Sequence, residues 1–285
     1  MVEKYQDWLH MSKSIQKDIT PKLRFPEFSK TEIWSEKRLS DLFQIGSGKD
    51  YKHLSEGDIP VYGSGGYMLS VNDFLYDGES VCIGRKGTID NPIFLTGKFW
   101  TVDTLFYTHS FNNCLPKFIF YLFQGIDWRK HNEAGGVPSL SKEIINKIKT
   151  FVPLSISEQQ KITDCLSTLD DLVAAQNDKV EKLKIYKNGL LQQLFPREGE
   201  VLPRLRFSEF KINGAWKEES LGSLASIIKL KNKDFAEERV LTNSAAQGVL
   251  DQRDFFEKDI AQKGKLNGYY IVNKGDFVYN PRVSN

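Results

Sequence analysis

The stretch that decides the fold is SISEQQKITDCLSTLDDLVAAQNDKVEKLKIYKNGLLQQLF, residues 155–195. It holds no proline and one glycine, and its apolar residues recur at alternating intervals of four and three. Such intervals are typical of a coiled-coil seam, whereas a helix lying on a globular core carries a broader apolar stripe. The seam positions predicted to pair with another helix are Ile162, Leu166, Leu169, Val173, Val180, Leu183, Leu190 and Leu194, interrupted by Gln176 and Lys187.

Both ends of this helix carry signals. Ser155 with Glu158, or Ser157 with Gln160, predicts a capping box, and Pro196 ends the helix. At 1.5 Å per residue, about 39 residues form a rod about 58 Å long. A rod with one apolar seam needs a partner helix. The alternative is a long core helix of a globular domain, which the two polar seam positions disfavour because they suit a register-setting layer.

One octapeptide stands on each side of the helix, as PKLRFPEF at residues 21–28 and PRLRFSEF at 203–210. The match continues at the same offset of 182 (203 − 21) as WSEKRLSDL, 34–42, and WKEESLGSL, 216–224, which makes ten identities in 22 positions. Average residue usage would give about one or two. The sequence therefore predicts a repeated domain.

The repeat reaches further with a changed offset. DGESVCIGRKG, 77–87, aligns with KGDFVYNPRVS, 274–284, at an offset of 197, so the second copy carries an insertion of 15 residues (197 − 182). This alignment matches Arg85 to Arg282. Loops that vary around a kept frame are typical of a repeated domain.

These features predict an α/β domain, a long coiled-coil-type spacer helix and a partial second α/β domain. The expected boundaries are an N-terminal extension at 1–20, the first domain at 21–153, the helix at 154–196 and the partial domain at 197–285.

Within the first domain, short β runs lead into glycine loops at DIPVYGSGGY, 58–67, and ESVCIGRKGT, 79–88. The segment NPIFLTGKFWTVDTLFYTH, 91–109, predicts two strands around a turn at Gly97, and a helix is expected over 115–130.

Composition excludes several classes. The chain has 285 residues and a net charge of +2, without the long apolar run of a membrane span, so we expect a cytoplasmic globular protein with no membrane contact.

Its cysteines, Cys82, Cys114 and Cys165, are read as buried apolar residues, and no spacing of Cys or His predicts a metal site. GSGKD at 46–50 is too short for a phosphate-binding Walker loop and is read as a turn. No catalytic motif is found, so catalytic residues are predicted to be none.

Three glycine loops instead combine backbone N–H groups with basic and hydroxyl side chains, which phosphate oxygens and base edges accept. Each loop alone can be a simple turn, and Arg85 can form a surface salt bridge with Asp90 or Glu79. Together the loops predict DNA binding through Tyr62, Ser64, Gly65, Gly66, Arg85, Lys86, Gly87, Thr88, Gly135, Gly136, Ser139 and Lys142.

The lead-in PxLRFxEF…W…L before each domain, and EAGGVPSLSKEIINKIKTFVPLSISEQQKI at 133–162, closely resemble the specificity subunit of bacterial type I restriction-modification systems. GDFVYNPRVSN, 275–285, is similar to the family's second domain.

The resemblance implies a subunit without catalytic activity in which two recognition domains each bind half of a split DNA sequence, with two helices antiparallel between them. It also implies as partners double-stranded DNA, two modification subunits that methylate adenine, and a restriction and translocation subunit. S-adenosylmethionine, Mg²⁺ and ATP then belong to the partner subunits, and this chain carries no cofactor.

The chain departs from the family pattern because it halts at Asn285 within the second domain, as a fragment or a truncated product would. A homodimer through the spacer helix is expected to replace the missing second helix. Two other classes stay open: a coiled-coil adaptor that binds proteins without DNA specificity, and an enzyme with an unrecognised site.

Overall fold

The structure, a computed structural model, describes residues 21–30, 33–234, 237–244, 247–256 and 266–279. The chain divides into two compact units, Met1–Lys184 and Ile185–Asn285. The domain boundaries expected from the sequence stay a prediction. Within the described ranges, no helix combines the length and apolar character that a membrane crossing requires.

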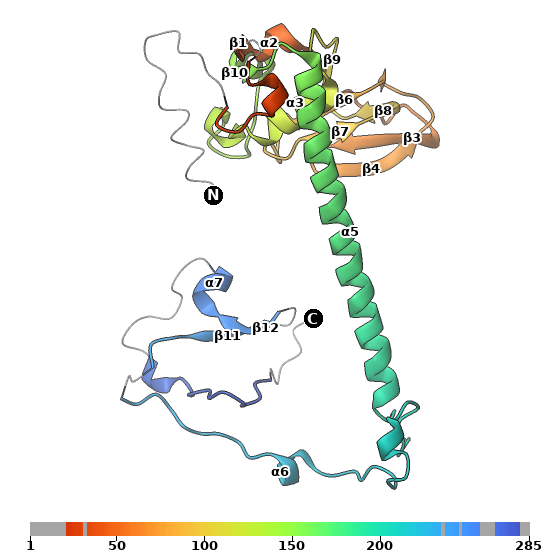
Figure 1. The fold of residues 1–285 in the computed structure, drawn as a ribbon, viewed down its shortest axis with the longest axis vertical. Coiled ribbons are helices and arrows are strands. Elements are labelled where there is room, and N and C mark those ends of the chain that lie inside the picture. The colour runs from red at the N-terminus through yellow and green to blue at the C-terminus, as the bar shows by residue number, and fades with distance from the viewer. Residues whose placement is uncertain (1–20, 31–32, 235–236, 245–246, 257–265, 280–285) are drawn as a thin grey trace. The chain divides into compact units, whose positions relative to one another are not determined.

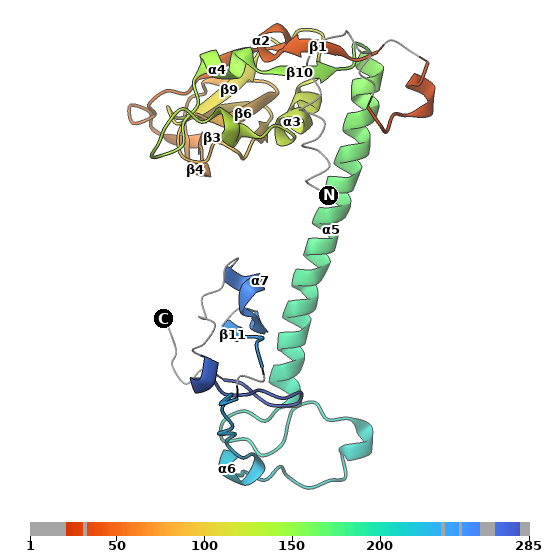
Figure 2. The same cartoon turned by 90° about the vertical axis from the view of Figure 1, so that its left-hand side faces the viewer.

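Two four-stranded sheets form the centre of the first unit (Figures 1 and 2). One has the order β2-β9-β6-β7 with antiparallel neighbours, and the other has the order β4-β3-β8-β5, in which β3 and β8 are parallel. The strands are β2 Gln44–Ser47, β3 Glu56–Gly63, β4 Gly66–Val71, β5 Tyr76–Asp77, β6 Ser80–Gly84, β7 Ile93–Leu95, β8 Lys98–Thr101 and β9 Leu105–His109. With the helices below, they confirm the expected α/β class.

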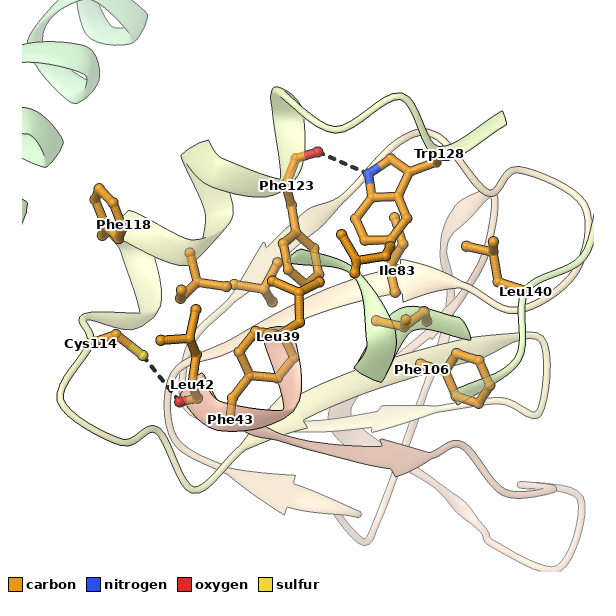
Figure 3. Close-up of a cluster of buried hydrophobic side chains, with 14 of the residues drawn as sticks. Leu39, Leu42, Phe43, Ile83, Phe106, Cys114, Phe118, Phe123, Trp128 and Leu140 are labelled. Carbon is orange, nitrogen blue, oxygen red and sulfur yellow. Dashed lines mark hydrogen bonds between the residues drawn. The ribbon is translucent and has the colours of Figure 1, made fainter. Parts of the chain in front are cut away.

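The main hydrophobic core lies between the first sheet and the helices α2 (Leu39–Leu42), α3 (Pro116–Gln124) and α4 (Lys142–Lys147) (Figure 3). Side chains alternate across a strand, so Val81 and Ile83 of β6 enter this core while Cys82 joins Phe99 in a separate cluster. Strand β6 is therefore buried throughout.

The helix predicted over 115–130 is too long. Helix α3 ends at Gln124, and a separate 3-10 turn, η2, covers Trp128–His131. The Trp128 indole N–H donates to the carbonyl of Phe123 at 2.8 Å, and the two rings meet with centroids 4.9 Å apart. Burial of this indole folds the chain back over the end of α3, which a continuous helix would prevent (Figure 3).

The turn at Gly97 exists, with φ of +73°, and strands β7 and β8 flank it as predicted. Strands β7 and β8 pair in different sheets, and a third strand, β9, follows them. The turn predicted at 46–50 is partly wrong, because Gly46 belongs to β2. A Cβ there would lie 2.1 Å from the Tyr107 ring, so this strand needs glycine for packing.

Helix α5 spans Ile156–Leu194 as one element of 39 residues, which confirms the predicted long helix. The first turns are packed against the domain, whereas every residue from 168 to 188 is exposed. The seam residues Leu169, Val173, Val180 and Leu183 are 48–58% exposed, so α5 is not a core helix.

Two details at the start of α5 refine the sequence reading. The Ser155 hydroxyl accepts from the Glu158 N–H at 3.3 Å, so half of the first predicted capping box is present. The Glu158 side chain bonds to Arg24 and Trp34 instead of completing the box.

Cys165 is exposed on α5, contrary to the expectation of three buried cysteines.

A short sheet leads into α5. Strand β1 (Ser35–Arg38) pairs antiparallel with β10 (Lys149–Val152), and residues 153–155 connect β10 to the helix. Strand β1 is therefore joined to the strand that runs into α5, beside the N-terminal end of the helix (Figure 2).

The second unit repeats local structure of the first at the predicted offset. Turns η1 (Pro26–Phe28) and η3 (Ser208–Phe210) are both 3-10 helices 182 residues apart (208 − 26), as are the one-turn helices α2 and α6 (Leu221–Leu224; 221 − 39). Its other elements are β11 (Leu241–Ser244), β12 (Gly248–Asp251), α7 (Gln252–Phe256) and η4 (Leu266–Gly268). Arg282, the predicted partner of Arg85, lies outside the described residues.

Candidate functional site

The three predicted glycine loops come together in the first unit. The Gly87 N–H donates to the Pro138 carbonyl at 2.9 Å, and the Leu140 N–H donates to the Arg85 carbonyl at 2.9 Å. An isolated β-bridge between Lys86 and Ser139 joins the same two loops. The sequence neighbourhoods 85–88 and 135–142 therefore form one surface.

The three loops are numbered in chain order as the first (62–66), the second (84–88) and the third (135–139). The first loop, at the tip of the β3–β4 hairpin, lies against the second. A Cβ on Gly87 would come within 3.2 Å of the Ser64 hydroxyl oxygen, so the two loops are adjacent. Next to this tip, the rings of Tyr62 and Tyr67 meet edge to face with centroids 6.1 Å apart. Tyr67, which is not among the predicted DNA-binding residues, is 62% exposed.

Glycine is required at particular points of these loops. Gly66 and Gly87 have φ of +110° and +87°, which favour glycine. At Gly84 a Cβ would stand 1.9 Å from the Thr88 carbonyl oxygen, so the loop can close only on glycine. By contrast, Gly135 and Gly136 have open space around them and are exposed.

The third loop is held by Asn132. Its side-chain oxygen accepts from the N–H groups of Ala134 at 3.1 Å and Ser139 at 2.8 Å, and its amide donates to the Ala134 carbonyl at 2.8 Å. The loop leads into α4, whose N-cap hydroxyl, from Ser141, accepts from the Ile144 N–H at 3.3 Å. These contacts shape the loop without using its exposed glycines.

A cleft of about 460 Å³ opens where the second and third loops meet. Four predicted site residues line it, namely Arg85, Lys86, Ser139 and Lys142. It also contains residues that the sequence reading missed, among them Ser47, Phe106, Glu133 and Glu143. Glu133 and Glu143 are close in sequence to the predicted residues Gly135 and Lys142, and this closeness was the one signal that could have indicated them. Phe106 comes from β9 and carried none.

Two basic residues define the cleft. The Lys142 ammonium donates to the Ile45 carbonyl at 2.8 Å and lies 5.9 Å from the centre of the Phe106 ring. The Arg85 side chain is exposed, and its Nη1 donates to the Asp103 carbonyl at 3.3 Å. Among the described residues no carboxylate forms an ion pair with Arg85.

The suggested salt bridge of Arg85 with Asp90 is wrong. Asp90 accepts from Arg129 Nε at 2.6 Å, and this hydrogen bond lowers the pKa of the Asp90 carboxyl. The Arg85 guanidinium therefore keeps donors available beside the cleft.

The remaining predicted residues differ in exposure. Gly65, Lys86, Gly87 and Thr88 are exposed, while Tyr62, Ser64, Gly66, Ser139 and Lys142 are half-buried. The structure thus brings all twelve onto one group of adjacent loops, and four of them into the cleft. Their contact with DNA stays a prediction.

His109 lies at the end of β9, and its pKa is lowered by burial and then by Lys142. Within the described part of the chain, no three His, Cys, Asp or Glu side chains gather as a metal site would require. What the cleft offers is a set of hydrogen-bond donors and acceptors.

A family model described as "Type I restriction modification DNA specificity domain" matches residues 31–184, which are 154 of the 285 residues (184 − 31 + 1). A curated relative, the type I restriction enzyme MjaVIII specificity subunit of Methanocaldococcus jannaschii, is 26% identical over 188 residues, covering 58% of this chain and 43% of its own length.

Two solved structures are also similar. The S subunit of a type I restriction-modification system from M. genitalium has 23% identity and a TM-score of 0.46, covering 57% of this chain and 46% of its own. A structure concerned with complex assembly and conformational transition of the type I system has 13% identity and a TM-score of 0.47, covering 66% and 48%. The chain spans less than half the length of each of these relatives.

Proposed function

The chain belongs to the family of type I restriction-modification DNA specificity proteins, and we propose that its first unit reads one half of a bipartite target in double-stranded DNA. In this proposal the chain recognises sequence and has no catalytic role of its own. The reading surface is the group of three loops around the Arg85 cleft.

The observation that carries this proposal is the meeting of three loops from distant parts of the sequence on one surface. They are joined by the Gly87–Pro138 and Leu140–Arg85 hydrogen bonds and by the closeness of Ser64 to Gly87. Loops placed on a rigid scaffold are where binding residues concentrate. The scaffold here is the pair of sheets with their buried core.

The cleft suits base edges better than phosphate alone. Arg85 and Lys86 offer donors of the kind that guanine O6 and N7 accept, while Glu133 and Glu143 can accept from the cytosine amino group. Carboxylates repel phosphate, so their presence beside two cations favours a base-reading role over simple backbone attraction.

The exposed part of α5 is proposed as the pairing surface for another helix. Residues 164–171 contain three aspartates, and residues 179–187 contain four lysines with one glutamate. An antiparallel partner with the same sequence places acidic half against basic half, whereas a parallel partner places like charges together. A homodimer through α5 is therefore proposed to be antiparallel.

The same complex would provide the remaining partners. Two modification subunits that methylate adenine and a restriction and translocation subunit are proposed to assemble with this chain. S-adenosylmethionine, Mg²⁺ and ATP would be bound by those subunits.

The test starts with purified chain and a pool of duplexes carrying a random region. We expect selection of one short sequence, with log affinity falling linearly in log salt by about 0.9 per phosphate contacted. Arg85→Ala should weaken that selected complex by about 1–3 kcal/mol and relax one base position. The control is Lys149→Ala, which removes an exposed cation of β10 that pairs with Glu36 of β1.

The adaptor alternative is favoured by the exposed seam of α5, and the same experiment separates it. Binding of DNA with no sequence preference, or equal losses for Arg85→Ala and Lys149→Ala, would refute the reading role. A protein partner whose affinity barely changes with salt would then point to the adaptor. Methylation or cleavage of DNA by the purified chain alone would refute the absence of catalysis.

A further inference from the structure

The loop that connects β2 to β3, residues 48–55, lies next to the reading surface. Ser47, the last residue of β2, lines the same cleft as Arg85. At the next position the chain passes close to the connection between β8 and β9, where a Cβ on Gly48 would stand 1.9 Å from the Val102 carbonyl oxygen. The β2–β3 loop therefore leaves the cleft pressed against that connection.

The connection between β8 and β9 holds the second loop as well. The Thr104 carbonyl accepts from the Arg85 N–H at 2.8 Å and from the Lys86 N–H at 3.3 Å. At the end of β8, the Thr101 carbonyl accepts from the Lys49 N–H at 2.8 Å. One short segment thus fixes the second loop and the β2–β3 loop next to each other.

Packing holds the inner side of the β2–β3 loop. Tyr51 and Leu54 pack against the hydrophobic cluster that contains Trp100. The Trp100 indole N–H donates to the Lys49 carbonyl at 2.9 Å, and the His53 ring meets the indole edge to face with centroids 5.8 Å apart. Because these contacts use the backbone and the rings, the lysine side chains of the loop stay outside.

The outer side of the β2–β3 loop is basic. Lys49 and Lys52 are exposed, as is Lys86 on the adjoining second loop. Among the described residues, no carboxylate forms an ion pair with any of these three lysines. Asp50 is the one acidic residue of the loop, so with its histidine neutral the loop has a net charge of +1 (2 − 1). A phosphate that approaches this side need not displace an internal partner.

We infer that the β2–β3 loop binds the phosphate backbone of the DNA beside the bases read in the cleft, with Lys49 and Lys52 as the phosphate contacts. The inference rests on the proposed function and adds to it the contacts that position the duplex. A lysine ammonium binds phosphate as a compact point charge, and phosphate contacts fix register without carrying sequence information. The cleft complements this role, because its carboxylates, Glu133 and Glu143, repel phosphate.

The experiment uses the full chain and two labelled duplexes, one with the selected sequence and one with a scrambled sequence. Fluorescence anisotropy gives the affinity for each duplex between about 50 and 200 mM salt. Lys49→Gln combined with Lys52→Gln should make the slope of log affinity against log salt shallower by about 1.8, because each phosphate contact contributes about 0.9. The ratio of the two affinities should stay within about twofold of the parent's ratio, since phosphate contacts weaken all sequences alike.

Two further variants control for net charge and for folding. Lys147→Gln combined with Lys149→Gln removes two charges from exposed positions at the end of α4 and in β10, and it should keep the parent's slope. Lys49→Arg combined with Lys52→Arg keeps both charges in the loop, so it should also keep the parent's slope. Near-ultraviolet circular dichroism should be the same for all of these variants.

A parent-like slope in the glutamine variant of the loop would overturn the inference, as would an equal loss of slope in the Lys147 and Lys149 control or a lost slope in the arginine variant. A changed affinity ratio would also overturn it, because these lysines would then belong to the base-reading groups. Failure of the proposed function looks different. The parent chain would then show no sequence preference, and the slope on the scrambled duplex would still decide whether the two lysines contact phosphate.

Discussion

Removing the Glu158 carboxylate tests the joint between the recognition domain and α5. Glu158→Ala leaves the Arg24 fork and the Trp34 indole without their shared acceptor at a site where the two charged side chains are 6% and 1% exposed. Breaking a buried pair by removing one partner costs about 3–5 kcal/mol, because the remaining charge loses the carboxylate that it was buried against. We expect the first unit to lose free energy of unfolding in that range.

Glu181→Ala is the matched control on the same helix. Glu181 pairs with Lys184 at 2.7 Å, but the two side chains are 63% and 64% exposed. Solvent screens such a pair, so its removal should cost no more than about 0.5 kcal/mol. The two variants delete the same side chain from α5 and differ chiefly in burial.

Urea unfolding followed by tryptophan fluorescence measures the difference. With a slope of about 1–3 kcal/mol per M, Glu158→Ala should lower the first-unit midpoint by at least about 1 M. Replacing both partners, as Arg24→Met with Glu158→Leu, should recover much of the loss, since no buried charge is left alone. A Glu158→Ala midpoint within about 0.3 M of the Glu181→Ala midpoint, or a double variant no better than the single one, would refute the reasoning.

The pH dependence of this contribution follows from Arg24. Its hydrogen bond to Glu158 raises the pKa of the Arg24 guanidinium above its ordinary value. Because the folded-state pKa is raised, the stabilisation from this pair is fully present at pH values below the unfolded-state pKa of Arg24. It is lost only as the pH rises through the folded-state pKa. The difference between Glu158→Ala and the parent chain should therefore stay constant across neutral and mildly alkaline pH.

Two further predictions concern α5 and the thiols. Leu169→Asp combined with Leu183→Asp should abolish helix pairing and recruitment of the modification subunit while leaving the near-ultraviolet circular dichroism of the first unit unchanged; normal co-purification would contradict the assignment of the seam. Burial raises the pKa of Cys82 to about 12, so at pH 8 a thiol reagent should modify only the exposed Cys165 quickly, and Cys165→Ser should leave no fast-reacting thiol in the native chain.

Much of the organisation was predictable from local sequence. The four-and-three spacing across residues 155–195 specified a long helix, and α5 spans 39 residues as expected. Helical periodicity and capping depend on neighbours in the chain, so they can be read without a fold. The repeat was equally local, and its two 3-10 turns and two one-turn helices recur at the predicted offset of 182.

Failures of prediction fall where packing decides the outcome. The helix over 115–130 ends early because the Trp128 indole is buried and bonds back to the Phe123 carbonyl, five residues earlier. Gly46 was read as part of a turn, yet its missing side chain makes room within a strand for Tyr107, which is 61 residues away (107 − 46). The strands on either side of Gly97 were predicted, but only the tertiary structure placed them in different sheets.

The candidate site shows the same division. Sequence by itself determined that three glycine loops carry donors suited to nucleic acid, since residue type decides what a side chain can donate or accept. Only the tertiary structure decided that Arg85, Ser139 and Lys142 share one cleft with Glu133 and Glu143, and that Arg24 and Trp34 meet on Glu158. Trp34 and Arg24 lie 124 and 134 positions from Glu158 and reach it through strand pairing and core burial, which are properties of the whole chain.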